Sequence, residues 1–84
     1  MKPIVSIIIP IFNRVHLIEE TLTSILKQSF TDWECIIIDD GSTDNTIQVI
    51  EEFVKNDSRF RVYRRPSDRP KGANVCRNIG IEKA

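Results

Sequence analysis

The sequence predicts an α/β fold, a Rossmann-like half-domain of three layers in which a strand and a helix alternate three times. Two apolar, largely β-branched runs, at 4–9 and 36–38, are typical of strands buried on both faces. Apolar residues at helical spacing follow each of these runs. A third segment, 60–64, alternates apolar and charged residues, which indicates a half-buried edge strand. We therefore expect one parallel sheet with strand order 3-2-1, half of a doubly wound sheet.

The first unit begins with the strand at 4–9. We expect Pro10 to end this strand, because proline cannot donate a hydrogen bond to a central ladder. Asn13 is predicted to be the N-cap of the following helix, whose apolar face recurs at Val15, Ile18, Leu22 and Ile25 or Leu26. Residues 28–32 form the return loop, Trp33 leads into the central strand, and the crossover should be right-handed.

An acidic turn, 39–43, follows the central strand. Its Ser42 and Thr43 can cap a helix that runs from about 44 to 54. After the third strand and its loop, the last segment, 73–84, carries apolar residues at helical spacing and is predicted to be a helix. These elements complete the three strand–helix units.

Composition limits the class of protein. With 84 residues there is room for one small domain, a size at which a single hydrophobic core is only just sufficient to stabilise the fold. Lys and Arg number 12 and Asp and Glu number 12, so no net charge favours nucleic acid or an acidic membrane surface. We expect Cys35 and Cys76 to be reduced packing residues, and the alternative is a single disulfide. No apolar stretch reaches the about 18 residues that span a bilayer, and Pro10 interrupts the N-terminal apolar run, which argues against a signal peptide.

The junction of central strand and acidic turn is a candidate ligand site, because ligands bind at the carboxyl ends of strands in open α/β sheets. Successive strand side chains point to opposite faces, so Asp39 and Asp40 cannot both face one ligand. We expect one to brace the turn by accepting hydrogen bonds from loop N–H groups, and the other to face the crevice. A carboxylate there can accept a hydrogen bond from a base N–H or a ribose hydroxyl. The alternative is that both only form Asx-turns before the helix.

Three loops should meet at this edge of the sheet, 10–14, 40–43 and 65–72. A planar base could stack on Phe12, beside the amide of Asn13. Phosphates could meet helix N-termini and the basic residues in and directly before the third loop, which are Arg64, Arg65, Arg69 and Lys71. The alternatives are that Phe12 only fills the core, that Asn13 only caps a helix, and that the basic residues form a solvated face.

Four stretches carry a resemblance to a known family: IVSIIIPIFN at 4–13, QSFTDWE at 28–34, IIIDDGSTDNT at 36–46 and GANVCRNIGIEKA at 72–84. In this order and spacing the chain resembles the start of the inverting glycosyltransferases with the GT-A fold, usually called family 2. The resemblance covers essentially the whole chain, and the DDGSTD run after a strand is its most specific part. It implies that 1–84 is the nucleotide-binding front part of a GT-A domain whose donor is a nucleotide sugar, most often a UDP-sugar.

The resemblance also implies roles for individual residues. Pro10, Phe12 and Asn13 match the loop that lines the base in the family, and Phe12 stands where the family often has tyrosine. Asp40 matches the carboxylate that contacts uracil or ribose. Asp39 and Ser42 are expected to be structural residues of the turn, and the pair 77–78 is treated as structural. The implied nucleotide-binding residues are Pro10, Phe12, Asn13, Asp40, Lys71 and Gly72.

Two functional elements of the family match nothing in this chain. They are an Asp-x-Asp element that holds Mg²⁺ or Mn²⁺ on the diphosphate and a later general-base aspartate. We therefore expect a truncated fragment, inactive by itself, with no catalytic and no metal-ligating residue. The full-length enzyme should be a metal-dependent hexosyltransferase that transfers a sugar to an acceptor hydroxyl with inversion, in polysaccharide, cell-wall or glycoconjugate synthesis. Its expected location is the cytoplasm or the inner face of the membrane.

A second hypothesis belongs to a different class of function. It is a non-catalytic α/β module that binds a nucleotide or oligomerises and is complete as it stands. In the full family fold another strand would pair with the outer edge of the strand at 4–9, so in a truncated fragment we expect that edge to be open, long and apolar, which favours association. We expect a homo-oligomer joined through this edge or through the apolar surfaces left uncovered, and the alternative is a crystal-packing contact only.

Overall fold

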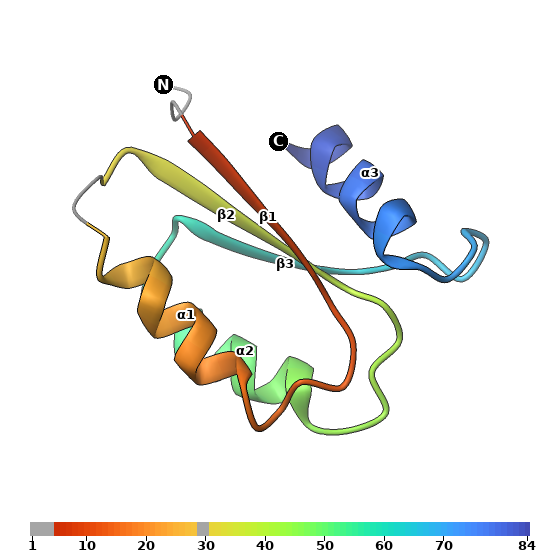
Figure 1. Ribbon diagram of the computed structural model, residues 1–84, viewed down its shortest axis with the longest axis horizontal. Coiled ribbons are helices and arrows are strands. Elements are labelled where there is room, and N and C mark those ends of the chain that lie inside the picture. The colour runs from red at the N-terminus through yellow and green to blue at the C-terminus, as the bar shows by residue number, and fades with distance from the viewer. Residues whose placement is uncertain (1–4, 29–30) are drawn as a thin grey trace.

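The computed structural model describes residues 5–28 and 31–84, in which three strands alternate with three helices (Figure 1). In chain order the elements are β1 (Val5–Ile11), α1 (Ile18–Leu26), β2 (Trp33–Asp39), α2 (Thr46–Val54), β3 (Phe60–Arg64) and α3 (Ala73–Lys83). The sheet has the order β1-β2-β3, and both pairs are parallel. The predicted fold class and strand order are confirmed, whereas Ile4, Ser29 and Phe30 of the predicted elements lie outside the described residues.

The sheet is the middle of three layers, with α1 and α2 on one face and α3 on the other (Figure 1). The side chains of β2 alternate between two cores, as a strand covered on both faces must. Cys35 and Ile37 belong to the core on the α1/α2 side, whereas Ile36 and Ile38 pack with Cys76 and Ile79 of α3. This alternation decides which layer each polar residue after β2 will meet.

Pro10 does not end β1, contrary to the sequence prediction, because the strand continues to Ile11. Pro10 lies opposite Ile38 and Ile11 lies opposite Asp39 in the ladder. Within the described sheet β1 pairs with β2 alone, so it is an edge strand. A residue without an N–H group is tolerated in an edge strand, since only one side of the strand needs donors.

The first two helices begin later than predicted, and the predicted caps are wrong. Residues 14–17 form a turn in which the N–H groups of Leu17 and Ile18 both donate to the Arg14 carbonyl at 2.9 Å, and α1 starts only at Ile18. Asn13 therefore does not cap α1. At α2 the Asp44 carboxylate, rather than Ser42 or Thr43, accepts from the Thr46 N–H at 3.0 Å. The Thr46 hydroxyl also donates to Asp44, and this bond lowers the pKa of that carboxyl group.

Both cysteines are free and fully buried, as expected of packing residues. Burial raises the pKa of the Cys35 thiol to about 12, because the thiolate would lose its hydration. Within 5–28 and 31–84, none of the helices has the length and apolar character needed to cross a bilayer.

Gly80 sets how closely α3 approaches the sheet. It is buried against Ile8 of β1, and a Cβ atom at position 80 would overlap Cγ2 of Ile8 and lie 3.3 Å from its Cγ1. Ile8 is β-branched and stiff at χ1, so it cannot move aside at low cost. Glycine here allows the close packing of the third layer on β1.

Gly80→Ala should destabilise the chain although alanine favours a helix interior by about 1 kcal/mol. The overlap with Ile8 is expected to lower the free energy of unfolding by about 1–3 kcal/mol, measured by urea unfolding. In an Ile8→Ala background, which removes the opposing atoms, the same substitution should cost nothing. Equal or greater stability of the single variant would contradict this packing.

Candidate functional site

The segments that follow the three strands, 12–17, 40–45 and 65–72, meet at one edge of the sheet, which we call the rim (Figure 1). Two backbone hydrogen bonds of 2.8 Å tie them together. The Asp40 N–H donates to the Ile11 carbonyl, and the Arg65 N–H donates to the Asp39 carbonyl. The ends of β1 and β3 are thus held on either side of the end of β2, as predicted for parallel strands.

Asp39 braces the turn that begins the rim. It is fully buried, and its Oδ2 accepts from the N–H groups of Gly41 at 3.1 Å and Ser42 at 2.9 Å. The Ser42 hydroxyl donates to Oδ1 at 2.5 Å. Gly41 has a φ of +88°, a conformation that side chains rarely adopt. Asp39 therefore holds a tight turn and has no oxygen directed at solvent.

Asn13 links the first rim segment to this turn. Its Oδ1 accepts from the N–H groups of Thr43 at 2.8 Å and Asp44 at 3.4 Å, and its own N–H donates to the Ser42 hydroxyl at 2.8 Å. It has a φ of +49°, in the left-handed region that asparagine tolerates better than most residues. This conformation explains why Asn13 does not cap α1, since an N-cap residue usually lies in the β region.

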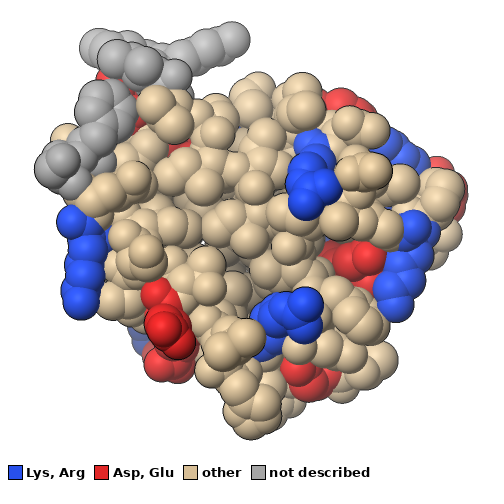
Figure 2. Space-filling view, viewed as in Figure 1, with Lys and Arg blue, Asp and Glu red and all other residues tan. Residues whose placement is uncertain are grey.

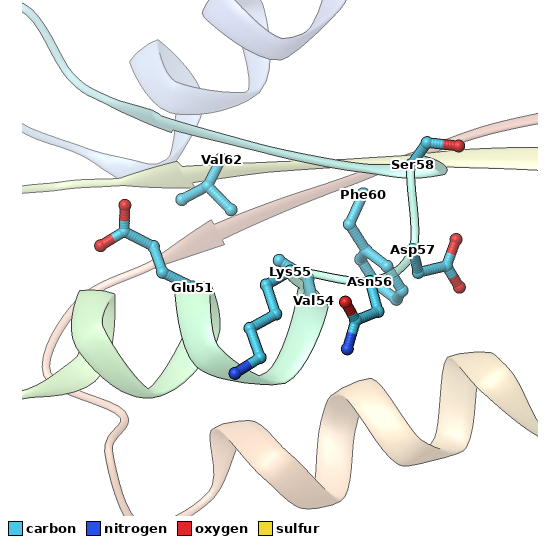
Figure 3. A pocket seen from close by; sticks show the side chains of 8 residues that line it. All are labelled: Glu51, Val54, Lys55, Asn56, Asp57, Ser58, Phe60 and Val62. Atoms are coloured by element: carbon cyan, nitrogen blue, oxygen red, sulfur yellow. The ribbon is translucent and has the colours of Figure 1, made fainter.

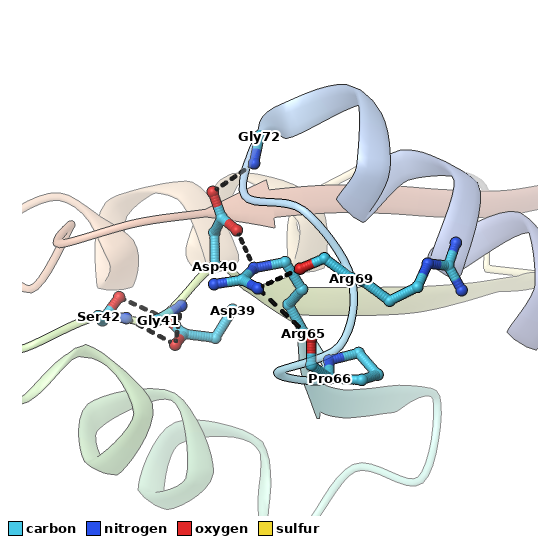
Figure 4. A network of polar contacts seen from close by, with 8 residues as sticks. All are labelled: Asp39, Asp40, Gly41, Ser42, Arg65, Pro66, Arg69 and Gly72. Atoms are coloured by element: carbon cyan, nitrogen blue, oxygen red, sulfur yellow. Dashed lines mark hydrogen bonds and ion pairs between the residues drawn. The ribbon is translucent and has the colours of Figure 1, made fainter.

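Asp40 lies on the opposite side of the rim, toward α3. It is 7% exposed, and both of its carboxylate oxygens have partners (Figure 4). Oδ1 accepts from Nε of Arg65 at 2.5 Å, and Oδ2 accepts from the Gly72 N–H at 3.1 Å. Asp39 and Asp40 thus face different layers, as the alternation of strand side chains requires.

Phe12 and Lys71 are in contact beside Asp40. The Lys71 ammonium lies 3.6 Å from the centroid of the Phe12 ring, which is the geometry of a cation–π interaction. Lys71 precedes Gly72, whose N–H reaches Asp40, so one short segment touches both Phe12 and Asp40. We call Phe12, Asp40, Arg65, Lys71 and Gly72 the Asp40 cluster.

The structure therefore divides the predicted nucleotide-binding residues into two groups. Phe12, Asp40, Lys71 and Gly72 lie in the Asp40 cluster, and half-buried Pro10 lies in β1 on the same face as Ile8, toward α3. Asn13 lies apart from them, in the turn held by Asp39 and Ser42.

Sequence reasoning assigned no specific role to Arg65, which it grouped with the other basic residues of the third loop. Besides Asp40, its Nη1 donates to the carbonyls of Arg69 at 2.6 Å and Pro66 at 3.3 Å. Arg69 itself pairs with Glu82 at 3.3 Å. Arg65, Arg69 and Lys71 therefore all have partners within the chain, so the loop is not a free cationic patch. The available signal was the position of Arg65, directly after an edge strand that ends beside Asp39.

The rim does not fit a divalent metal ion. Among residues 5–28 and 31–84 no three His, Cys, Asp or Glu side chains come together as a metal site would require. The carboxylates of Asp39, Asp40 and Asp44 are each occupied by donors of the chain. These carboxylates therefore serve contacts within the chain.

A groove lies away from the Asp40 cluster. It is an open groove between the end of α2 and the outer edge of β3, lined by Glu51, Val54, Lys55, Asn56, Asp57, Ser58, Phe60 and Val62 (Figure 3). Asp57 is engaged by Arg59, whose guanidinium lowers the pKa of that carboxyl group. The groove lies toward the start of β3, away from the carboxyl ends of the strands where ligands bind in open α/β sheets, so the rim remains the candidate site.

Comparison with known proteins gives a consistent result. A family model described as glycosyl transferase family 2 matches residues 6–84. An Escherichia coli protein, UDP-Glc:alpha-D-GlcNAc-diphosphoundecaprenol beta-1,3-glucosyltransferase WfgD, is 38% identical over 81 residues, which are 96% of this chain and 30% of that protein. The chain spans at most about a third of the length of these curated relatives, from 11% to 32%.

Two solved structures share the fold. S. aureus TarS 1–349 in complex with UDP-GlcNAc superposes with a TM-score of 0.80 at 32% identity, and the match covers 100% of this chain and 24% of the 1–349 chain. The mannosyltransferase PcManGT from Pyrobaculum calidifontis, in complex with GDP-Man and Mn²⁺, superposes with a TM-score of 0.83 at 25% identity. It covers 100% of this chain and 25% of that enzyme.

Substitutions at Asn13 should separate its two contributions to the rim. Asn13→Ala removes the side-chain oxygen that accepts from two loop N–H groups. It also puts alanine at a positive φ, which alanine tolerates less well than asparagine. We therefore expect the free energy of unfolding to fall by about 2 kcal/mol. Asn13→Gly restores the conformational freedom and should lose less, and Asn13→Asp keeps an acceptor and should lose least. Urea unfolding measures all three, and an alanine variant as stable as the aspartate variant would refute the linkage.

Proposed function

The chain belongs to glycosyltransferase family 2, and on that premise we propose that residues 1–84 form the nucleotide-binding front part of an enzyme that transfers a sugar from a UDP-sugar to an acceptor hydroxyl with inversion. The observation that carries the proposal is the Asp40 cluster. It combines an aromatic ring, a nearly buried carboxylate and a loop N–H at the carboxyl ends of β1 and β2. The ring and the carboxylate would bind a flat base with a polar edge, and the Gly72 N–H holds the carboxylate in place.

Base recognition would use Phe12 and Asp40 together. The base would stack on the Phe12 ring, exchanging with the Lys71 ammonium that lies over that ring or using the other ring face. Its ring N–H would donate to a remaining lone pair of the Asp40 carboxylate, which has about four in total. Uracil and guanine both carry such an N–H, and the two matched structures were solved with UDP-GlcNAc and GDP-Man. The higher identity with TarS supports uracil.

The chain's own residues would bind and orient the donor rather than break the glycosidic bond. Pro10, Phe12 and Asp40 would hold the nucleoside, and Lys71 and Gly72 would close over it. We propose that the general base and the ligands of Mg²⁺ or Mn²⁺ belong to other parts of a longer enzyme, because the described residues contain no fitting cluster. The metal would stabilise the diphosphate leaving group.

The acceptor class is proposed from the relatives. WfgD is named for a diphosphoundecaprenol-linked acceptor, which supports a role in polysaccharide, cell-wall or glycoconjugate synthesis. A lipid-linked acceptor would place the enzyme in the cytoplasm, at the inner face of the membrane.

Nucleotide titrations test the proposal directly. UMP and UDP should bind the chain more tightly than CMP or AMP in calorimetric titrations. Asp40→Asn and Phe12→Ala should each weaken UMP binding about tenfold, through loss of the charged acceptor and of base stacking. Asp68→Asn, an exposed loop aspartate, is the matched control and should bind as the unchanged chain does. Absence of UMP binding, or binding unaffected by Asp40→Asn, would refute the proposed site.

We also propose that the chain forms a homo-oligomer through the outer edge of β1. In the described sheet that edge is unpaired. The neighbouring groove between β1 and α1 is lined by four apolar residues, Ile7, Ile9, Leu17 and Ile25, together with Glu20, Thr21 and Ser24. Leu17 is 56% exposed. Figure 2 shows few charged side chains in the middle of the face over which β1 runs in Figure 1. An unpaired apolar edge favours pairing with a second copy.

Sedimentation velocity over a range of concentrations tests the association. We expect a dimer or larger species that Leu17→Glu dissociates, because a charge would be buried in the contact. The control is Ser58→Glu, an exposed residue just before β3 at the opposite edge of the sheet, and it should leave the association unchanged. A monomer at every concentration would contradict the proposal.

A further inference from the structure

We propose that Arg65 is a positioning residue that fixes the Asp40 carboxylate and thereby restricts the site to bases that bring a ring N–H group. The inference rests on the proposed function and adds a residue that selects among nucleotides without touching them. In the network of polar contacts in Figure 4, the Arg65 guanidinium lies between Asp40 and the loop carbonyls.

Two donors hold the Asp40 carboxylate from different directions. Nε of Arg65 donates to Oδ1 at 2.5 Å, and the Gly72 N–H donates to Oδ2 at 3.1 Å. Because each oxygen has its own donor, rotation of the carboxylate about the Cβ–Cγ bond would break both bonds. The side chains of Asp40 and Arg65 are 9% and 16% exposed, so water cannot easily replace either partner. The two remaining lone-pair directions are therefore fixed.

Arg65 is itself held by groups other than Asp40. Its N–H donates to the Asp39 carbonyl at 2.8 Å, and Nη1 donates to the Arg69 carbonyl at 2.6 Å. A Cβ atom at Gly41 would lie 3.6 Å from Nη2, so the guanidinium also lies against the acidic turn. Contacts with both β2 and the third loop thus set the direction from which Arg65 approaches Asp40.

A fixed carboxylate distinguishes bases by whether their ring nitrogen donates or accepts a hydrogen bond. Uracil N3 and guanine N1 carry a hydrogen and can donate to a free lone pair of Asp40. Cytosine N3 and adenine N1 are acceptors and would face a carboxylate oxygen without a hydrogen between them. A carboxylate free to rotate could instead accept from the exocyclic amino group of cytosine or adenine. Loss of Arg65 should therefore reduce selectivity more than it reduces the binding of uracil nucleotides.

The planar fork of arginine is the property that matters. Nε and Nη1 reach Asp40 and the Arg69 carbonyl at the same time, and a lysine ammonium is a point charge that cannot span both acceptors in fixed directions. Arg65→Lys keeps the positive charge but loses the orientation. This variant separates a positioning role from a purely electrostatic one.

The experiment compares UMP and CMP binding by calorimetry in the unchanged chain, Arg65→Lys, Arg65→Gln and Arg64→Lys. Arg64 is the neighbouring arginine and is exposed, so Arg64→Lys is the matched control. We expect the ratio of UMP to CMP affinity to fall about tenfold in both Arg65 variants, which corresponds to one well-formed hydrogen bond. The ratio should not change in Arg64→Lys. Circular dichroism checks that each variant is folded.

The outcomes separate this inference from the proposed function. If the unchanged chain binds UMP selectively and Arg65→Lys keeps the same ratio, the positioning role is overturned and the proposed function stands. If the unchanged chain does not bind UMP, both are overturned. A measurement without any variant completes the test: the Arg65 Nε–H signal in NMR spectra should stay protected from solvent exchange when UMP is added. Loss of that protection on binding would overturn the inference.

Discussion

The side chains of β2 point alternately to two buried layers, and the rest of the molecule is arranged around this constraint. Ile36 and Ile38 meet α3, whereas Cys35 and Ile37 meet the core under α1 and α2. The alternation continues into the two aspartates that follow. Asp39 is directed to the α1/α2 side and closes a turn, and Asp40 is directed to the α3 side and joins a cluster with an aromatic ring. Two adjacent carboxylates thus have different tasks because a strand has two faces.

The rim is a set of polar groups that satisfy one another before any ligand arrives. Asp40 is held by Arg65 and Gly72, and Phe12 is covered by the Lys71 ammonium. A ligand at this site would therefore replace existing contacts rather than fill empty ones. An arriving base would exchange a cation–π contact for stacking and would add a hydrogen bond to lone pairs that the fixed carboxylate still offers. Such exchange favours ligands that match the site in both shape and polarity.

Much of this arrangement follows from the sequence, because strand and helix types depend on periodicity over many residues. The three strands, the three helices, the strand order and the separation of Asp39 from Asp40 were all predicted from the sequence. The errors concerned single residues. Pro10 stays within β1 because an edge strand needs donors on one side only, and Asn13 turns to the acidic loop because its backbone is left-handed. The pairing of Arg65 with Asp40 was not predicted, because the only signal was the position of Arg65 after the edge strand and the contact itself depends on the meeting of β2 and β3 at the rim.

The central claim is that a uracil nucleotide binds with its base on Phe12 and its ring N–H on Asp40. The most direct measurement is the set of intermolecular NOEs between UMP and the isotope-labelled chain. The account predicts NOEs from the uracil H5 and H6 protons to the Phe12 ring, together with a slowly exchanging N3 imino proton near Asp40. NOEs confined to the groove between α2 and β3, or the absence of NOEs to any part of the rim, would contradict this claim.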